Sequence, residues 1–161
     1  YHFMMFLGIN SLYIIVYISL LILFVFLFPG MIFQSFMSVV GFFITLLLSI
    51  YMSYCIYFIM VCFAFWFGEV RSIVVAYNVG MLMISGQYIP IRLFPKEILA
   101  FLEWTPIPYL VDLPVSIATG LIDQNQWGSE ILPGLLWAFI LTILSFMIYR
   151  FGIKGYEAYG Q

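Results

Sequence analysis

Residues 86–120, GQYIPIRLFPKEILAFLEWTPIPYLVDLPVSIATG, differ in composition from the rest of the chain. This stretch holds five of the seven prolines, Pro90, Pro95, Pro106, Pro108 and Pro114. It also holds five charged side chains, Arg92, Lys96, Glu97, Glu103 and Asp112. Long apolar runs precede and follow it, so prolines and charged side chains interrupt an otherwise apolar sequence here. How the chain folds depends on this interruption.

The composition of the whole chain predicts an integral membrane protein. Of the 161 residues, 66% are hydrophobic and only 7% are charged, and the mean hydropathy is +1.17. In a soluble domain roughly a quarter of the residues are charged. This chain has too few charged residues to cover a water-facing surface. The net charge of −2, with 5 basic residues, provides no basic patch and excludes a nucleic-acid partner.

The fold class expected from the apolar runs is all-α, a polytopic bundle of transmembrane helices in one domain. The expected spans are residues 11–28, 34–66, 72–89 and 131–149. A span needs about 20 apolar residues, and a helix over residues 34–66 would be about 48 Å long, so it would tilt or project from the bilayer. A hairpin of two spans within residues 31–67 is the alternative, although no turn signal lies near its middle.

Small residues recur every four positions in two of these expected helices. They are Gly41, Thr45, Ser49 and Ser53 in one, and Ser72, Ala76 and Gly80 in the other. Such stripes let helices approach each other closely in a membrane, so we expect both to be packing faces. Cys55 and Cys62 lie seven residues apart inside the same apolar run. With no further ligands nearby they predict buried thiols, and no metal site is expected.

The basic residues predict an orientation. With four spans, Arg71, Arg150 and Lys154 lie on the same side of the membrane, and Arg92 and Lys96 lie on the other. Basic residues favour the cytoplasmic side, so the C-terminal tail is expected in the cytoplasm and residues 86–120 are expected to face outward. A hairpin within residues 31–67 would invert this arrangement.

The proline-rich stretch is too broken to cross the membrane. Pro95 favours a helix start, and that helix must end just before Pro106, because the residue preceding a proline is disfavoured in the α region. The remaining length of about ten residues gives about 15 Å, half of a span. A second short piece is expected to bend at Pro114 and to end at Gly120. Lipid-exposed irregular backbone is not viable, so residues 91–120 predict a re-entrant or interfacial helical hairpin before the last span.

Three stretches resemble a known family: FWFGEVRSIVVAYNVG, the quoted residues 86–120, and the ending RFGIKGYEAYG. Their order and spacing are similar to permease subunits of type-2 ATP-binding-cassette exporters, in particular the "ABC-2 family transporter protein" group. In residues 86–120 the likeness lies in a small residue and a proline, then Phe-Pro, a hydrophobic helix, and Thr-Pro or Leu-Pro. The resemblance covers most of residues 10–160.

This resemblance implies a transport subunit of a bacterial inner membrane. It implies a second permease subunit, identical or different, around a shared path, and two separate ATPase subunits. Family members have six spans, so two further spans and a coupling segment are expected upstream of Tyr1. A P-loop needs Gly-x4-Gly-Lys-Ser/Thr, and neither Lys96 nor Lys154 lies in such a motif. ATP and Mg²⁺ are therefore expected on the partner ATPase, this chain is not expected to be an enzyme, and it is expected to bind no cofactor itself.

Several residues are candidates for a role in transport. Asn78 and Gln87 are candidates for the substrate path, although Asn78 is also expected to bond across helices as structural glue. Glu69 and Arg71 are expected to mark the membrane interface, with contact to the ATPase as the alternative. The resemblance implies that the hairpin forms part of an outer gate, and its candidate residues are Pro95, Glu103, Pro106, Pro108 and Asp112. Glu103 and Asp112 could instead simply reach interfacial water.

Two other functions remain open from the sequence. The chain could be a structural subunit of a larger membrane assembly, such as a respiratory complex, because its small, Met- and Phe-rich composition fits one. It could also be an intramembrane enzyme that uses Glu103 and Asp112. No catalytic pair is indicated, since there is no histidine partner and no nucleophile motif.

Overall fold

The protein is described by a computed structural model, which defines residues 35–86 and 91–159 and eight single positions between residues 15 and 27. Side chains of residues 92 and 155–159 are not described. The defined elements are α2 (Phe36–Cys62), α3 (Ala64–Phe67), α4 (Arg71–Ile84), η1 (Ile91–Leu93), α5 (Lys96–Glu103), α6 (Ile107–Leu110), α7 (Asp112–Ala118), η2 (Gln124–Gln126) and α8 (Trp127–Tyr159). Every regular element of these residues is helical, so the fold is all-α. The expected span at residues 11–28 lies largely outside the described residues.

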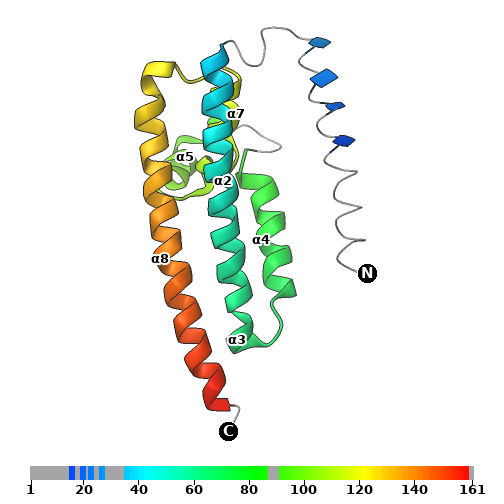
Figure 1. Ribbon diagram of the computed structural model, residues 1–161, viewed down its shortest axis with the longest axis vertical. Coiled ribbons are helices and arrows are strands. Elements are labelled where there is room, and N and C mark those ends of the chain that lie inside the picture. The colour runs from blue at the N-terminus through cyan, green and yellow to red at the C-terminus, as the bar shows by residue number, and fades with distance from the viewer. Residues whose placement is uncertain are drawn as a thin grey trace.

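Two long helices form the axis of the molecule. α2 and α8 lie side by side over most of their length, with α3 and the C-terminal part of α8 at the same end (Figure 1). Met52, Cys55 and Ile59 of α2 pack with Ala138 and Leu141 of α8 in the main core. Further along the seam, the hydroxyl groups of Tyr51 and Thr142 lie 2.7 Å apart. Residues 36–62 thus form a single helix in this structure.

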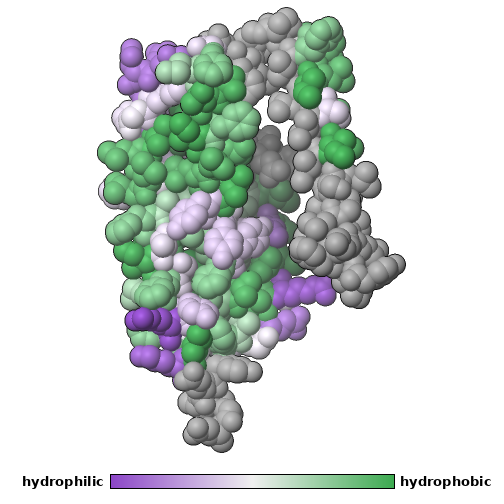
Figure 2. All heavy atoms as spheres, in the orientation of Figure 1, coloured by the Kyte–Doolittle hydropathy of each residue, from purple (hydrophilic) through white to green (hydrophobic). Residues whose placement is uncertain are grey.

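Most of the bundle surface is apolar. Large side chains such as Leu47, Phe139 and Phe146 are more than half exposed. Figure 2 shows hydrophobic residues over the middle of the visible face, with hydrophilic residues gathered toward its two ends. Two segments, Phe36–Phe67 and Gln124–Lys154, are long and apolar enough to cross a membrane. An exposed apolar area of this extent would not be stable in water, so the described bundle is suited to lipid.

α4 is shorter than the span expected over residues 72–89. It begins at Arg71 and ends at Ile84, and its 14 residues extend about 21 Å. After the helix, Gly86 takes a φ of 87°, a left-handed conformation that turns the chain away. Residues 87–89 lie outside the described part. α4 therefore covers only part of the length of α2, and the short helices α5–α7 lie beyond its C-terminal end (Figure 1).

The proline-rich stretch folds into three short helices, here called the hairpin (residues 95–120). α5 starts after Pro95 and ends at Glu103, close to the expected limits. α7 ends in a Schellman arrangement, in which Gly120 has a φ of 69° and the amides of Gly120 and Leu121 bond back to Ile117 and Ser116. Both ends of the hairpin thus follow from local backbone chemistry.

The expected bend at Pro114 was wrong in detail. The second half of the hairpin breaks at Val111, with φ −132° and ψ −51°, and Pro114 lies inside the first turn of α7. A proline ring clashes with the carbonyl four residues before it, so the break falls upstream of Pro114. α8 begins at Trp127, four residues before the start of the expected span over residues 131–149, and Pro133 lies inside the helix.

Gly41 lets the start of α8 approach α2. A Cβ built at Gly41 would lie 2.6 Å from the Trp127 ring and 3.1 Å from Ile117. The indole of Trp127 is itself held by a 3.2 Å hydrogen bond to the carbonyl of Ile122.

We expect Gly41→Val to destabilise the protein by about 1–3 kcal/mol, because added methyl groups would overpack this contact. The free energy of unfolding in mixed micelles measures the effect. Gly80→Val on α4 is the control, since nothing lies within 4 Å of its Cβ position. Equal stability of the two variants would show that the Gly41 contact is not tightly packed.

Candidate functional site

The hairpin buries apolar side chains and packs against α2. Leu102 of α5 and Ile117 of α7 are 2% and 0% exposed, although adjacent positions such as Phe101 are open to the surroundings. α7 and α6 both pack along α2, and α5 contacts α6. The irregular backbone between these helices is therefore covered by protein on the α2 side, as re-entrant segments require.

One buried hydrogen bond ties the hairpin to the small-residue stripe of α2. Pro114 has no N–H, so the carbonyl of Leu110, four residues earlier, receives no helical hydrogen bond from it. The buried hydroxyl of Ser49 donates to that carbonyl. Leu110 itself lies in the main core with Met52. Ser49 on α2 thus supplies the hydrogen bond that Pro114 on α7 cannot.

We expect Ser49→Ala to lower the free energy of unfolding by about 1–3 kcal/mol, because it leaves the Leu110 carbonyl buried without a donor. Thermal unfolding in detergent measures this change. Ser145→Ala serves as the control, since the exposed Ser145 hydroxyl bonds only within α8, to the Thr142 carbonyl. A loss no greater than that of the control would show that the Leu110 carbonyl finds another donor.

Glu103 and Asp112, both predicted hairpin-gate residues, line one cavity of about 320 Å³. The carboxylate of Glu130, from the start of α8, lines the same cavity, as does the phenol of Tyr109. Asp112 is half-buried and accepts a long 3.5 Å hydrogen bond from Ser116, whereas Glu103 and Glu130 are exposed. Three acidic residues, one each from α5, α7 and α8, therefore line this cavity.

The pKa of Tyr109 reflects its burial and the carboxylates of this cavity. Burial raises the pKa of its hydroxyl, and the carboxylates of Glu130 and Glu103 raise that pKa further. The phenol consequently stays neutral and can donate a hydrogen bond. Glu130 and Tyr109 were not among the residues predicted from sequence. Glu130 lies 27 positions after Glu103, and no sequence periodicity joins them.

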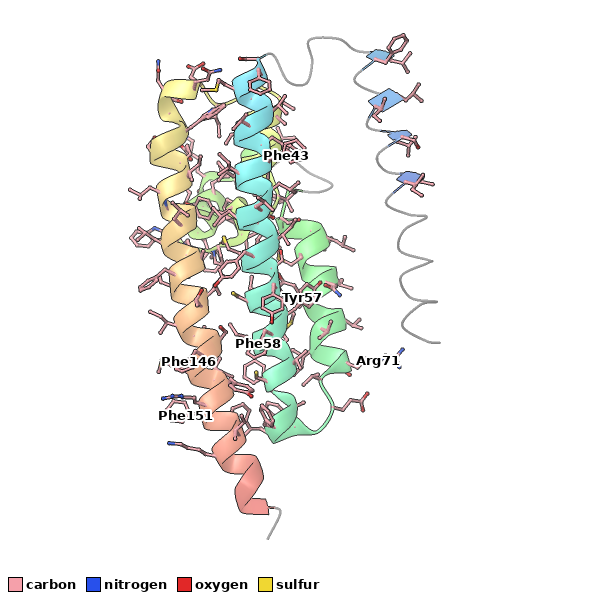
Figure 3. All side chains as sticks on the ribbon, in the orientation of Figure 1. Phe43, Tyr57, Phe58, Arg71, Phe146 and Phe151 are labelled. Atoms are coloured by element: carbon pink, nitrogen blue, oxygen red, sulfur yellow. The ribbon has the colours of Figure 1, made fainter. Side chains whose placement is uncertain are left out.

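Asn78, a predicted substrate-path residue, bonds across helices. The hydroxyl of Tyr57 on α2 donates to Oδ1 of Asn78 on α4 at 2.5 Å. The Tyr57 ring also meets the Tyr77 ring edge-on at 5.7 Å, and Figure 3 shows Tyr57 directed toward α4. This hydrogen bond is the kind expected of structural glue, and Asn78 also borders a cavity. Gln87 lies outside the described residues.

The two small-residue stripes lie in different surroundings. On α2, Thr45 is buried and its hydroxyl bonds to the Gly41 carbonyl at 2.9 Å, while Ser53 is half-buried. On α4, Ser72 and Ala76 are exposed and Gly80 is half-buried. Cys55 and Cys62 are free and buried, as expected.

The remaining candidates lie at chain turns. Pro95 precedes α5, and Pro106 and Pro108 open α6. Glu69 and Arg71 are exposed where α3 turns into α4 through Gly68, which has a φ of 71°. Arg71 lies toward the end of the bundle that also carries the C-terminal part of α8 (Figure 3). Within the described ranges, no three His, Cys, Asp or Glu side chains gather to hold a metal ion.

The described elements define a class of protein: an all-helical membrane bundle with a folded-back segment packed against its longest helices. Comparison with protein families then matches residues 3–160 to "ABC-2 family transporter protein". Because the match covers nearly the whole chain, the chain belongs to this family, and it is a membrane protein of the permease type. Comparison with curated proteins and with solved structures gave no significant match.

Proposed function

We propose that the chain is the membrane-spanning permease subunit of an ATP-driven exporter. It would form the translocation path with a second permease subunit and couple to two separate ATPase subunits. The observation that carries the proposal is the family match over residues 3–160. The absence of a P-loop motif in the sequence supports ATP hydrolysis on a partner chain.

The hairpin gives the proposal a mechanical element. Its helices are too short to cross a bilayer, and α6 and α7 pack against α2. Turns at Trp104–Pro106 and Val111 join them. Such short, hinged pieces can change position without unfolding a transmembrane helix. We assign Pro95, Pro106, Pro108, Glu103 and Asp112 to an outer gate on this basis, with Asn78 and Gln87 nearer the path.

At the opposite end of the bundle, Glu69, Arg71, Arg150 and Lys154 provide charged groups. Basic residues favour the cytoplasmic side, where ATPase subunits of a bacterial inner-membrane exporter would bind. The guanidinium of Arg150 lies 4.6 Å from the Phe146 ring centroid, which holds it close to α8. Arg71 is the residue of this end that is best placed to contact a partner, because it opens α4 beside an exposed turn.

Purification of the full-length tagged protein tests the proposal. An ATPase subunit with a P-loop should co-purify, and its hydrolysis rate should change when this chain is added back to it. A complex that contains haem, flavin or iron–sulfur absorbance and no P-loop subunit would contradict the proposal. That outcome would instead support the alternative of a structural subunit in a respiratory assembly.

A further inference from the structure

One buried hydroxyl group in the bundle has no partner. Ser85, at the C-terminal end of α4, is 1% exposed, and its Oγ makes no hydrogen bond within the described part of the chain. A buried hydroxyl without a partner has lost its hydration and gains no hydrogen bond in exchange. Folded proteins rarely carry such a group, so its presence calls for an explanation.

The Ser85 side chain lines a cavity of about 350 Å³ between α2, α4 and the α6–α7 junction, here called the polar cavity. Its other polar side chains are Ser53, Tyr57, Tyr77 and Asn78. The hydrogen bond from Tyr57 to Oδ1 of Asn78 leaves the amide nitrogen of Asn78 able to donate to a ligand. The lining thus offers hydroxyl groups, which both donate and accept, and an amide.

Among the side chains that the structure describes, those that line the polar cavity are all uncharged. An ionic group in these surroundings would lose its hydration without gaining a counter-charge, which is strongly unfavourable. The chemistry therefore selects an uncharged ligand group that is rich in hydroxyl groups, of the sugar or glycerol kind. This cavity is separate from the acidic one, and neither Glu103 nor Asp112 contributes to it.

An apolar cavity of about 420 Å³ adjoins the polar one. Tyr77, Met81 and Leu110 line both. Its remaining lining includes Gly80 of α4, Ile56 of α2 and the turn Thr105–Ile107. A Cβ built at Gly80 would have nothing within 4 Å, so the space beside this glycine is open. An alkyl chain fits such a surface.

We propose that these two cavities bind an uncharged amphiphile, with its hydroxyl-bearing head group at Ser85 and Asn78 and its alkyl chain along Gly80. The site is a property of this chain alone and does not require that the ligand be exported. It accounts for a buried serine at the C-cap of α4 whose hydroxyl has no partner within the described residues.

Native mass spectrometry of the full-length protein in a sugar-free polyoxyethylene detergent tests the site. Decyl glucoside should bind saturably, and at least about tenfold more tightly than either decyltrimethylammonium or free glucose. Decyltrimethylammonium lacks the uncharged, hydroxyl-bearing head group, and free glucose lacks the alkyl chain. Equal binding of the two decyl compounds, or no saturable binding, would overturn the proposal. Tight binding of free glucose would place the recognised group on a soluble sugar and not on an amphiphile.

Three variants sharpen the test. Ser85→Ala should weaken decyl glucoside binding by about two- to tenfold, as expected for one neutral hydrogen bond, while the ligand-free protein unfolds at the same or a higher temperature. Ser38→Ala, another buried serine but outside both cavities, should leave binding unchanged. Gly80→Leu should remove the difference in affinity between decyl glucoside and hexyl glucoside.

Unchanged decyl glucoside binding by Ser85→Ala would overturn the assignment. The assay contains no ATPase or transport step, so failure of the export proposal leaves its result unaffected.

Discussion

Replacing Ile117 by alanine is expected to lower the free energy of unfolding by about 2–5 kcal/mol. Ile117 is 0% exposed in the middle of α7, and its Cγ2 faces Gly41 on α2. The truncation would open a cavity at the contact that holds the hairpin on the bundle. Because the neighbouring helices are long and joined elsewhere, they cannot close that cavity completely.

The matched control is Val115→Ala, two positions earlier on the same short helix. Val115 is 48% exposed, so its truncation removes few protein contacts and should change stability by about 0.5 kcal/mol or less. Unfolding in mixed micelles, followed by circular dichroism, compares the two variants. If Ile117→Ala were as stable as Val115→Ala, α7 would not be anchored on α2 through this side chain.

The second large effect concerns the turn between α5 and α6. In the double variant Pro106→Ala with Pro108→Ala, both positions regain an N–H and lose a ring that clashes with the carbonyl four residues earlier. Proline is about 3 kcal/mol less favourable than alanine inside a helix. α5 would then be free to continue through Thr105, whose hydroxyl now bonds to the Leu102 carbonyl at 2.7 Å.

A straightened hairpin would withdraw Leu110 from Ser49 and disturb the proposed gate. Since each 1.4 kcal/mol shifts an equilibrium about tenfold, we expect export by the variant to fall at least about tenfold, with membrane insertion unchanged. Transport into inside-out vesicles, normalised to the amount of inserted protein, measures this. Pro133→Ala is the control, because Pro133 lies in α8, outside the hairpin and the proposed gate. Normal export by the double variant would show that the break has no gating role.

The location of Glu69 and Arg71 bears on how force could reach the hairpin. They lie at the end of the bundle away from α7, and α2 connects the two ends as one helix. A partner bound near Arg71 could therefore move the hairpin through rigid displacement of α2 and α4, without a conformational change inside either helix. In the proposed exporter, that partner is the ATPase.

The sequence by itself determined the class and the local breaks. Its apolar runs predict helices in lipid, because hydrocarbon leaves few other ways to satisfy backbone hydrogen bonds. Pro106 and Gly120 set limits within the hairpin through effects that act over a few residues. The three stretches that carry the family resemblance are continuous in the sequence, so the resemblance does not depend on how the helices pack.

Only the tertiary structure decided which distant groups meet. It put Glu130 into the cavity of Glu103 and Asp112, directed Ser49 at the carbonyl that Pro114 leaves unsatisfied, and buried Ser85 without a partner. It also moved the expected bend from Pro114 to Val111. Each of these outcomes depends on how helices far apart in the chain pack and rotate against one another, and neither proline spacing nor hydropathy carries that information.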